Sequence, residues 1–245
     1  MRFEKTDVWG FEHAVRGMRN PMNSWNKSDS EYGYDPLASM ADSRKYFYVG
    51  KNDMELMQRL IKAGGEHRKF MRQIFVSVDI TAPLYWWKEF DTYKVGTTAN
   101  STSTMHKLAT TPITLDCFET DDLADGDLTI GNYNCLKFMY NQIIDDCELL
   151  RQKHLEFANK AKNATSEEDK IIFQKQAKKY WKELIRWLPE SWLQTRTVTM
   201  NYENLYNICH QRKGHKLTEW HQFIDWAITL PYVNQLIFNE EVNEQ

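Results

Sequence analysis

Polar groups that bind anions are concentrated in one short stretch of the sequence. Residues 96–104 read GTTANSTST, a run of glycine, hydroxyl and amide groups with a single alanine among them. In a tight turn, the backbone N–H and side-chain O–H groups of such a run converge and bind a phosphate or another anion. An ordinary turn, whose hydroxyl groups bond to their own backbone, is the alternative interpretation.

A second polar segment begins at the end of an expected strand and continues into an expected helix. Residues 200–212 read MNYENLYNICHQR. Asn201 is well placed as the N-cap of this helix, because its side chain can accept a hydrogen bond from the first turn. Arg212 lies near the helix C-terminus, where its charge complements the helix dipole. Its guanidinium also presents several N–H donors to a ligand, so both residues have a structural and a binding interpretation.

The sequence lacks the patterns of several other kinds of site. There is no GxSxG, P-loop, GxGxxG or HExxH motif, and the seven histidines are scattered. The four cysteines form no CxxC pair, so we expect reduced and mostly buried thiols rather than a zinc site or disulfides. We predict no metal ligand and no catalytic side chain.

The elements that position the two segments are strands followed by helices. Residues 73–80 are β-branched and aromatic and predict a strand, and Pro83 starts a helix over residues 84–90 that leads to the polar run. Residues 195–200 alternate as a strand does, and the helix that starts at Asn201 breaks at Gly214.

The rest of the chain is mostly helical by its apolar spacing. Asp53 is the expected N-cap of a helix over residues 54–63. Ser166 and Asp169 form an expected capping box at the start of the second helix of a long hairpin. The segment 21–45 predicts a long loop, which is either functional, as a lid or a partner contact, or an inert excursion. In residues 1–20 we expect a short strand and then a helical turn or two, with Phe11, Val15 and Met18 spaced for one helix face. The other expected elements are a helix over 133–161, a helix over 166–187 and a helix over 217–229.

The pattern predicts an α+β fold, a mixed sheet flanked by long helices, in a single domain over residues 1–245. The chain is 42% hydrophobic and rich in aromatic residues, which suits a large core. The net charge of −3 gives no general attraction to nucleic acid or acidic membranes. With no signal peptide and no long apolar run, we expect a cytoplasmic protein without nucleic-acid or membrane partners.

The two polar segments together resemble the flavin-dependent thymidylate synthases. That family carries a signature RHRxxSxNxxSxRY and a later segment NxRxLxNFxxLR. In the later segment four residues fall in register: Asn201, Leu205, Asn207 and Arg212. In the first, Asn100 and Ser103 fall on the later Asn and Ser of the signature. The resemblance covers the order of elements over about residues 53–225.

Departures from the family pattern are concentrated at its arginines. Tyr93-Lys94-Val95 replaces Arg-His-Arg, or Thr92-Tyr93-Lys94 does if one residue is inserted. Met105-His106 replaces the closing Arg-Tyr, and Glu203 replaces the arginine of the later segment. A family histidine expected after the glycine turn falls near Met71, with His67 close by. Either other basic residues compensate or the ligand has changed; the candidates are Arg68, Lys69, Arg72, Lys88 and Lys107.

The resemblance implies a homotetramer in which FAD lies across a subunit interface and deoxyuridine monophosphate (dUMP) stacks on the flavin. Reduced flavin relays a methylene group from methylenetetrahydrofolate to the pyrimidine C5, with NADPH as the reductant. It implies substrate binding by Ser103, Thr104, His106 and Arg212. It implies cofactor binding by Lys94, Asn100, Asn201 and Asn207. Lys94 would be a phosphate charge, and surface or structural roles remain the alternatives for Ser103, Lys94 and His106.

From this resemblance we expect a divergent enzyme of nucleotide biosynthesis, an FAD-dependent methyltransferase that forms a methyl or hydroxymethyl pyrimidine. The alternative is a non-catalytic nucleotide-binding or interaction protein that keeps the fold. The loss of the Arg-His-Arg triplet favours the alternative.

Overall fold

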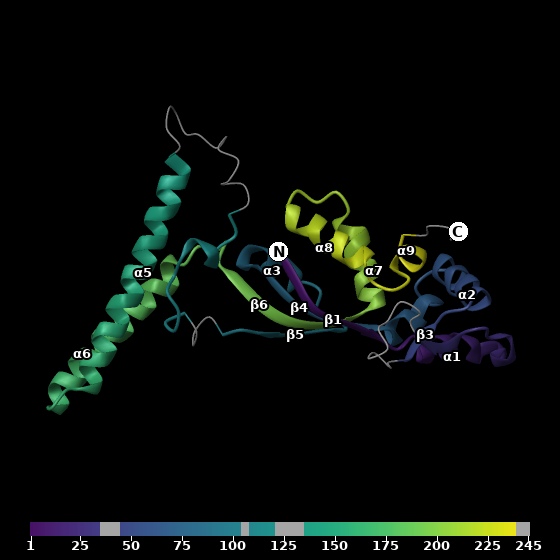
Figure 1. Ribbon diagram of the computed structural model, residues 1–245, viewed down its shortest axis with the longest axis horizontal. Coiled ribbons are helices and arrows are strands. Elements are labelled where there is room, and N and C mark those ends of the chain that lie inside the picture. The colour runs from purple at the N-terminus through teal and green to yellow at the C-terminus, as the bar shows by residue number, and fades with distance from the viewer. Residues whose placement is uncertain (35–44, 104–107, 121–134, 239–245) are drawn as a thin grey trace. The chain divides into compact units, whose positions relative to one another are not determined.

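The structure is a computed structural model that describes residues 1–34, 45–103, 108–120 and 135–238 (Figure 1). It contains both helices and strands, so the predicted α+β class is confirmed. The strands are β1 (Arg2–Trp9), β2 (Glu31–Tyr34), β3 (Lys45–Tyr48), β4 (Phe75–Pro83), β5 (Thr97–Ser101) and β6 (Leu193–Asn201). The α-helices are α1 (Phe11–Arg19), α2 (Lys51–Lys62), α3 (Leu84–Phe90), α5 (Cys135–Lys162), α6 (Glu167–Trp187), α7 (Tyr202–Arg212), α8 (Thr218–Ile228) and α9 (Val233–Leu236). Short 3-10 turns are η1 (Asn20–Met22), η2 (Trp25–Lys27), η3 (Arg68–Gln73) and η4 (Leu115–Cys117).

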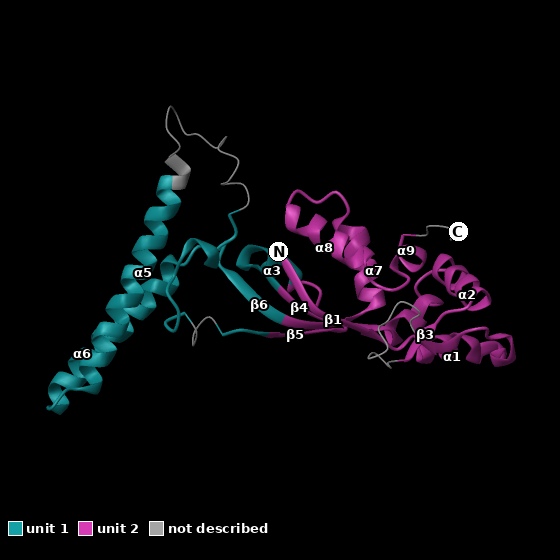
Figure 2. Ribbon diagram, viewed as in Figure 1, with its two compact units in different colours: residues 1, 81–90, 101–196 teal, residues 2–80, 91–100, 197–245 magenta. Residues whose placement is uncertain are grey.

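The contacts group the chain into two compact units (Figure 2). Unit 1 comprises residues 1, 81–90 and 101–196, and unit 2 comprises residues 2–80, 91–100 and 197–245. Each unit is built from segments far apart in the sequence. The single domain over residues 1–245 stays a prediction, and each unit is described by itself below.

Unit 2 contains the greater part of a four-stranded sheet with the order β1-β4-β6-β5. Successive side chains of a strand face opposite sides, and Val198 and Met200 of β6 are fully buried. The threonines between them bond across to β4: Thr197 donates to Asp79 at 2.5 Å, and Thr199 donates to Ser77 at 3.2 Å. Strand β4 covers residues 75–80 of the strand predicted at 73–80, and β6 covers all of the strand predicted at 195–200. Both predicted strands are therefore confirmed.

The described part of the polar run 96–104 forms a strand over residues 97–101, where we expected a turn. Residues 97–101 are β5, which pairs with β6 at the edge of the sheet. Threonine favours strands because its branched side chain suits a pleated surface. The prediction of a turn was wrong there because an edge strand obtains its bonds from a partner that lies almost a hundred residues away.

The first helices of unit 2 follow their apolar spacing. Phe11, Val15 and Met18 of α1 are buried, as the sequence predicts. Gly10 precedes this helix with a φ of 101°, and a Cβ there would lie 2.0 Å from the carbonyl oxygen of Gln73. Only glycine therefore allows the chain to turn from β1 into α1 at this point.

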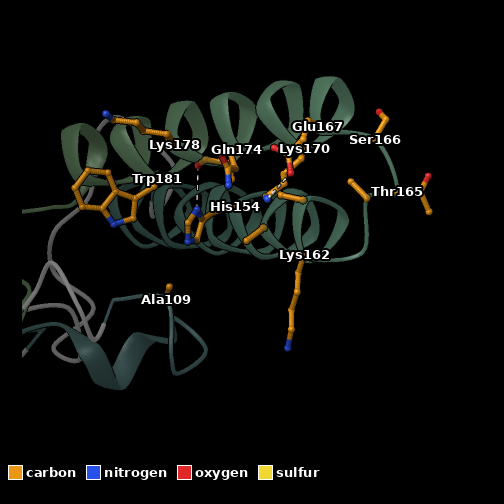
Figure 3. A pocket seen from close by; sticks show the side chains of 14 residues that line it. Ala109, His154, Lys162, Thr165, Ser166, Glu167, Lys170, Gln174, Lys178 and Trp181 are labelled. Atoms are coloured by element: carbon orange, nitrogen blue, oxygen red, sulfur yellow. Dashed lines mark hydrogen bonds and ion pairs between the residues drawn. The ribbon is translucent and has the colours of Figure 1, made fainter.

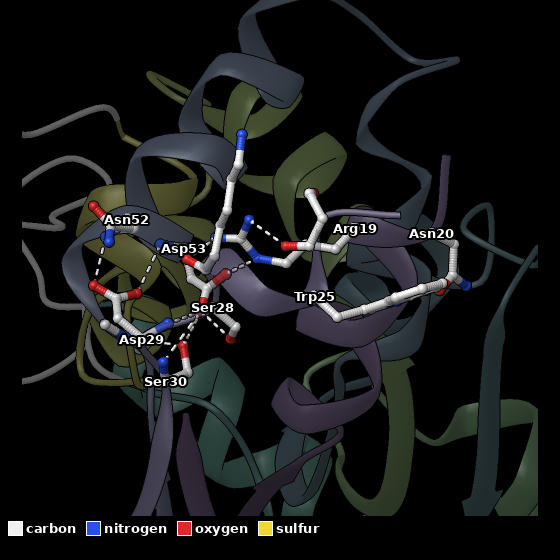
Figure 4. Close-up of polar contacts among 11 residues, drawn as sticks. Arg19, Asn20, Trp25, Ser28, Asp29, Ser30, Asn52 and Asp53 are labelled. Carbon is white, nitrogen blue, oxygen red and sulfur yellow. Dashed lines mark hydrogen bonds and ion pairs between the residues drawn. The ribbon is translucent and has the colours of Figure 1, made fainter. Parts of the chain in front are cut away.

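Asp53 is a buried ion-pair partner and not a helix cap (Figure 4). The helix begins three residues earlier than expected, at Lys51, so Asp53 lies inside its first turn. The side chains of Asp53 and Arg19 are 0% and 4% exposed, and Arg19 Nε lies 2.5 Å from Asp53 Oδ1. The other carboxylate oxygen accepts bonds from the Ser28 and Ser30 hydroxyls, both at 2.6 Å. Burial opposes ionisation of Asp53, but these bonds and the Arg19 charge outweigh it and lower its pKa.

The cap of α2 comes from a distant residue, Asp29. Its carboxylate accepts the backbone N–H groups of Asn52 at 2.8 Å and Asp53 at 3.1 Å. A Cβ on Gly50, the N-cap residue, would lie 2.4 Å from Asp29 Oδ1, so glycine leaves room for the carboxylate. A long-range side chain thus satisfies donors that a local cap usually satisfies.

The segment 21–45, expected to be a loop, contains regular structure where it is described. It forms the turns η1 and η2 and then β2, which pairs antiparallel with β3 as a two-stranded sheet. Tyr32 lies opposite Phe47, and their rings meet edge to face at 5.1 Å. Aromatic cross-strand pairs stabilise such a hairpin. The polar composition of the segment predicted a loop instead.

Unit 1 contains the helical hairpin that the sequence predicts. Helices α5 and α6 run over residues 135–162 and 167–187, and Ser166 caps α6 by accepting the Asp169 N–H at 3.1 Å. Cys147 of α5 is buried, and burial raises the pKa of its thiol to about 11. The apolar core beneath the hairpin consists of Leu108, Ile113, Phe118, Ile144, Cys147 and Leu184.

Helix α3 of unit 1 buries its aromatic side chains. Trp86, Trp87 and Phe90 are at most 1% exposed. Trp87 Nε1 donates to the Gln194 carbonyl at 3.0 Å, and the Arg196 guanidinium lies 4.2 Å from the Trp87 ring centroid. Among the described helices of both units, none combines the length and the apolar character that crossing a bilayer requires.

Candidate functional site

The two polar segments of the sequence meet in unit 2 along helix α7. Asn201 caps this helix by accepting the Asn204 N–H at 2.9 Å, which confirms the structural interpretation of Asn201. The Asn204 side chain in turn donates to the Val95 carbonyl. At the other end of α7, Arg212 Nε donates to the Tyr93 hydroxyl at 2.9 Å. The turn at residues 93–96 therefore follows α7 from one end to the other.

Gly96 allows this close approach of the turn to the helix. Its φ is 74°, and a Cβ there would lie 2.8 Å from both the Asn201 amide nitrogen and the Asn204 amide oxygen. A larger residue would strain the backbone and push the turn away from α7. The glycine thus keeps Lys94, an exposed residue of the turn, next to the helix.

Arg212 is held in place by aromatic side chains. Its guanidinium carbon lies 4.5 Å from the Trp220 ring centroid and 5.5 Å from that of Tyr93. Such cation–π contacts add to the hydrogen bond from Nε to Tyr93. Arg212 also lies in the last turn of α7, so the dipole interpretation and the binding interpretation both remain open. The sequence analysis singled out neither Tyr93 nor Trp220 as a partner of Arg212, since only the fold brings them together.

Glu203 neutralises part of the positive charge on the opposite flank of α7. Its side chain is 14% exposed, with Arg68 Nε at 3.5 Å and Arg72 as a second ion-pair partner. The hydrogen bond that Arg72 donates to Glu203, together with the Glu203 charge, raises the pKa of Arg72. Two of the basic residues named as possible replacements for the lost arginines are therefore engaged with a carboxylate.

Asn207 of α7 lies beside Arg68. Its side-chain oxygen accepts a bond from Arg68 at 3.3 Å, and the Arg68 guanidinium lies 4.3 Å from the Tyr206 ring centroid. In the described part of the chain, the buried Arg68 Nε has an ion-pair partner at 3.5 Å but no hydrogen-bond acceptor. The Thr97 hydroxyl, one residue after Gly96, is likewise buried without a described partner. Buried polar atoms of this kind call for an acceptor.

The other predicted site residues lie in β5, shortly after it, or outside the described residues. Asn100 is exposed in unit 2, near the end of β5. Ser103 follows this strand and belongs to unit 1, where it is half-buried. Thr104, His106 and Lys107 lie outside the described residues. Of the remaining basic candidates, Lys69 is exposed in unit 2, and Lys88 of unit 1 pairs with Glu190 at 2.7 Å.

A cavity in unit 1 contains none of the predicted site residues (Figure 3). It lies between α5 and α6, has a volume of about 810 Å³, and is lined partly by alanines, including Ala158 and Ala161. Its histidine, His154, donates through Nδ1 to the Ala177 carbonyl at 2.9 Å. The cavity exists because alanine side chains leave space between the two helices. Its histidine is engaged in a hydrogen bond within the hairpin.

The titratable groups within the described residues give no sign of a metal site or of an activated thiol. No group of three or more His, Cys, Asp or Glu among them could hold a metal ion. Cys209 on α7 is fully buried, and burial raises the pKa of its thiol to about 12. Since the thiolate is the reactive form, Cys209 is an inert core residue.

Comparisons with known proteins find similarity at the level of structure. The chain is similar to the flavin-dependent thymidylate synthase ThyX from Helicobacter pylori complexed with FAD and dUMP, with a TM-score of 0.61 and 15% identity. That similarity covers 98% of this chain and 99% of the other. A second structure of ThyX from Helicobacter pylori with FAD and dUMP has a TM-score of 0.59, 17% identity and 98% coverage of both chains. No protein-family model and no curated protein matches the sequence. The chain therefore has the fold of the flavin-dependent thymidylate synthases, as the sequence resemblance predicts.

Proposed function

We propose that the chain binds a pyrimidine nucleotide and FAD along helix α7 and transfers a one-carbon unit to C5 of the pyrimidine. The donor is methylenetetrahydrofolate, and the acceptor is dUMP or a related pyrimidine monophosphate. The observation that carries the proposal is the position of Arg212, held by Tyr93 and Trp220. It is supported by a fold shared over 98% of the chain with proteins complexed with FAD and dUMP.

In this proposal the nucleotide is oriented by Arg212. A guanidinium fixed by a hydrogen bond and two rings loses little freedom when a ligand binds, so its N–H donors are preorganised for a pyrimidine carbonyl or an anionic ring. Lys94, exposed on the adjacent turn, contributes a point charge for a phosphate. Neither residue attacks the base, and the chain contributes binding, orientation and electrostatics.

The residues on the other flank of α7 fit a polar cofactor. Arg68 Nε is a buried donor that lacks an acceptor among the described residues, and it lies beside Asn207 and the Tyr206 ring. Arg68 and Asn207 would hold a carbonyl or ring nitrogen of FAD. When bound, FAD supplies the relay of the one-carbon group and the reducing electrons.

Several parts of the proposal rest on the resemblance alone. They are the homotetramer, NADPH as reductant, a cytoplasmic location, and substrate contacts by Ser103, Thr104 and His106. The cofactor contacts proposed for Asn100 and Asn201 also rest on the resemblance alone. Asn201 already uses its side-chain oxygen to cap α7, so only its amide nitrogen would serve a ligand.

A second candidate function is a nucleotide-binding protein without catalysis. Glu203 favours it, because this carboxylate replaces an arginine of the family segment and pairs with Arg68 and Arg72. An anionic dinucleotide would have to compete with Glu203 for these cations. This candidate predicts binding of dUMP without retention of flavin.

The proposal is tested by isothermal titration calorimetry, in which dUMP is titrated into the purified protein and the binding affinity is measured. We expect the wild-type protein to bind dUMP and the Arg212→Ala variant to lose binding. Arg212→Lys should bind at least about tenfold more weakly than the wild type, because a lysine offers a point charge in place of the planar fork. Arg186→Ala, which removes an exposed arginine of α6, is the matched control and should bind normally. Unchanged binding by a folded Arg212→Ala protein would remove Arg212 from the site.

A further inference from the structure

A second cavity lies entirely within unit 2, next to the hairpin of β2 and β3. Its volume is about 600 Å³, within the range of sites for small organic ligands. The end of β1, the start of α1, the hairpin and the residues before α9 form its walls. None of the residues assigned to the α7 site lines it.

Aromatic rings dominate the walls of this cavity. Trp9, Tyr32, Tyr46 and Tyr48 are between 37% and 52% exposed, although all four line the same space. Exposed rings gathered at one cavity are a recognised feature of binding sites, whereas single exposed rings are not. Planar ring faces that are open to solvent suit the stacking of a flat heterocycle.

The back of the cavity is rigid. Tyr232 has a φ of 58°, in the left-handed region that bulky residues rarely adopt. Its hydroxyl accepts the Val49 N–H at 3.0 Å, and its ring meets Phe11 edge to face at 5.2 Å. These contacts hold the strained residue in place, so this wall is formed before any ligand arrives.

Polar side chains of both signs lie among the rings. The Tyr32 hydroxyl donates a hydrogen bond to the Glu12 carboxylate, and this bond raises the pKa of Tyr32. A carboxylate has about four acceptor positions, so Glu12 retains capacity for a ligand N–H. Lys45 and His13 also line the cavity and supply N–H groups for an anion.

We propose that this cavity binds a purine nucleoside monophosphate, as a site separate from the one on α7. The base stacks on the hairpin tyrosines, its N–H group donates to Glu12, and its phosphate meets Lys45. A planar base with an N–H edge and an anionic tail matches the rings, the carboxylate and the ammonium group together. The proposal does not depend on the function proposed for α7.

The test is calorimetric titration of adenosine monophosphate into the wild-type protein and five variants. Tyr46→Ala should weaken binding at least about tenfold, because base–aromatic stacking contributes to affinity by that order. Tyr46→Phe keeps the ring and should bind normally. Trp187→Ala is the matched control, since Trp187 is 66% exposed on α6 and does not line the cavity.

Glu12→Gln keeps the shape of Glu12 and should also weaken binding, which provides a second variant if Tyr46→Ala does not fold. The proposal is overturned if the wild-type protein binds no adenosine monophosphate, or if the folded Tyr46→Ala and Glu12→Gln proteins bind it normally. Loss of this binding in Arg212→Ala would place the nucleotide on α7 and would also overturn the proposal. Failure to bind dUMP, by contrast, counts only against the function proposed for α7.

Discussion

The helical hairpin of unit 1 and the N-terminal part of unit 2 are stabilised in opposite ways. The hairpin is lined with ion pairs three or four residues apart, such as Lys153–Glu156 and Lys160–Glu156. The N-terminal part of unit 2 depends on Arg19 and Asp53, which are 34 residues apart and buried. Exposed local pairs contribute little to stability, whereas a buried pair becomes very costly once one partner is removed.

This difference shows where a single substitution has the greatest effect. In the hairpin, each local pair is screened by water and the helices also depend on the core beneath them. Around Asp53, one carboxylate bonds to Arg19, Ser28 and Ser30 and so connects α1, the segment after it and α2. The second region therefore concentrates its stability in one side chain.

The largest expected effect is that of Asp53→Ala. Removal of the carboxylate leaves the Arg19 guanidinium buried without its charge partner, which should cost about 3–5 kcal/mol of unfolding free energy. Hydrogen exchange should show faster opening of α1 and α2 while the α5–α6 hairpin keeps its protection. Glu156→Gln, on the exposed side of that hairpin, is the matched control and should leave the unfolding midpoint unchanged. Equal midpoints for Asp53→Ala and the wild type would contradict the comparison.

An intermediate effect is expected at Glu148, a strongly held carboxylate of the hairpin. Its bonds to Arg151 lower its pKa to about 2 from an ordinary value of 4.5, although burial opposes this. A lowered pKa means that the added stability is complete above pH 4.5 and is lost as the pH falls toward 2. Glu148→Gln should therefore cost roughly 1–3 kcal/mol at neutral pH.

The measurement for Glu148 is denaturant unfolding between pH 2 and pH 7. The wild-type protein should lose stability across the lower part of this range, and Glu148→Gln should show a weaker dependence on pH. Parallel pH profiles for the two proteins would show that Arg151 does not hold this carboxylate in solution.

The smallest effect is expected at the cap of α6. Ser166→Ala removes the bond to the Asp169 N–H and should cost about 1 kcal/mol, since one cap donor becomes unsatisfied. Ser166→Asp keeps an acceptor and should restore the stability. A cost for Ser166→Ala as large as that of Asp53→Ala would remove the contrast between the two regions.

The features that the sequence predicted correctly are those with local causes. Ser166 and Asn201 are recognisable as caps because each bonds to a residue three positions further along. The apolar spacing of α1 places Phe11, Val15 and Met18 in the core without knowledge of any other element.

The features that it missed depend on distant partners. Asp53 resembles a cap in sequence, but Asp29 caps the helix, and Arg19 binds Asp53. The edge strand β5 reads as a turn because its partner is β6. In the candidate site, Arg212 was identified from its register in the family segment, whereas its contacts with Tyr93 and Trp220 exist only in the folded chain.

The charges along α7 decide between the two candidate functions. Arg212 and Lys94 favour an anionic nucleotide, and Glu203 opposes a second anionic ligand by pairing with Arg68 and Arg72. An enzyme requires both ligands on this helix, while a binding protein requires only the nucleotide.

The measurement that tests the central claim most directly is the visible absorbance spectrum of the purified protein after incubation with FAD and dUMP, followed by removal of free ligand. We predict that the wild-type protein retains flavin absorbance bands. A folded Asn207→Ala variant should retain flavin bands of lower intensity. A colourless wild-type protein that still binds dUMP would contradict the flavin enzyme and leave the nucleotide-binding function.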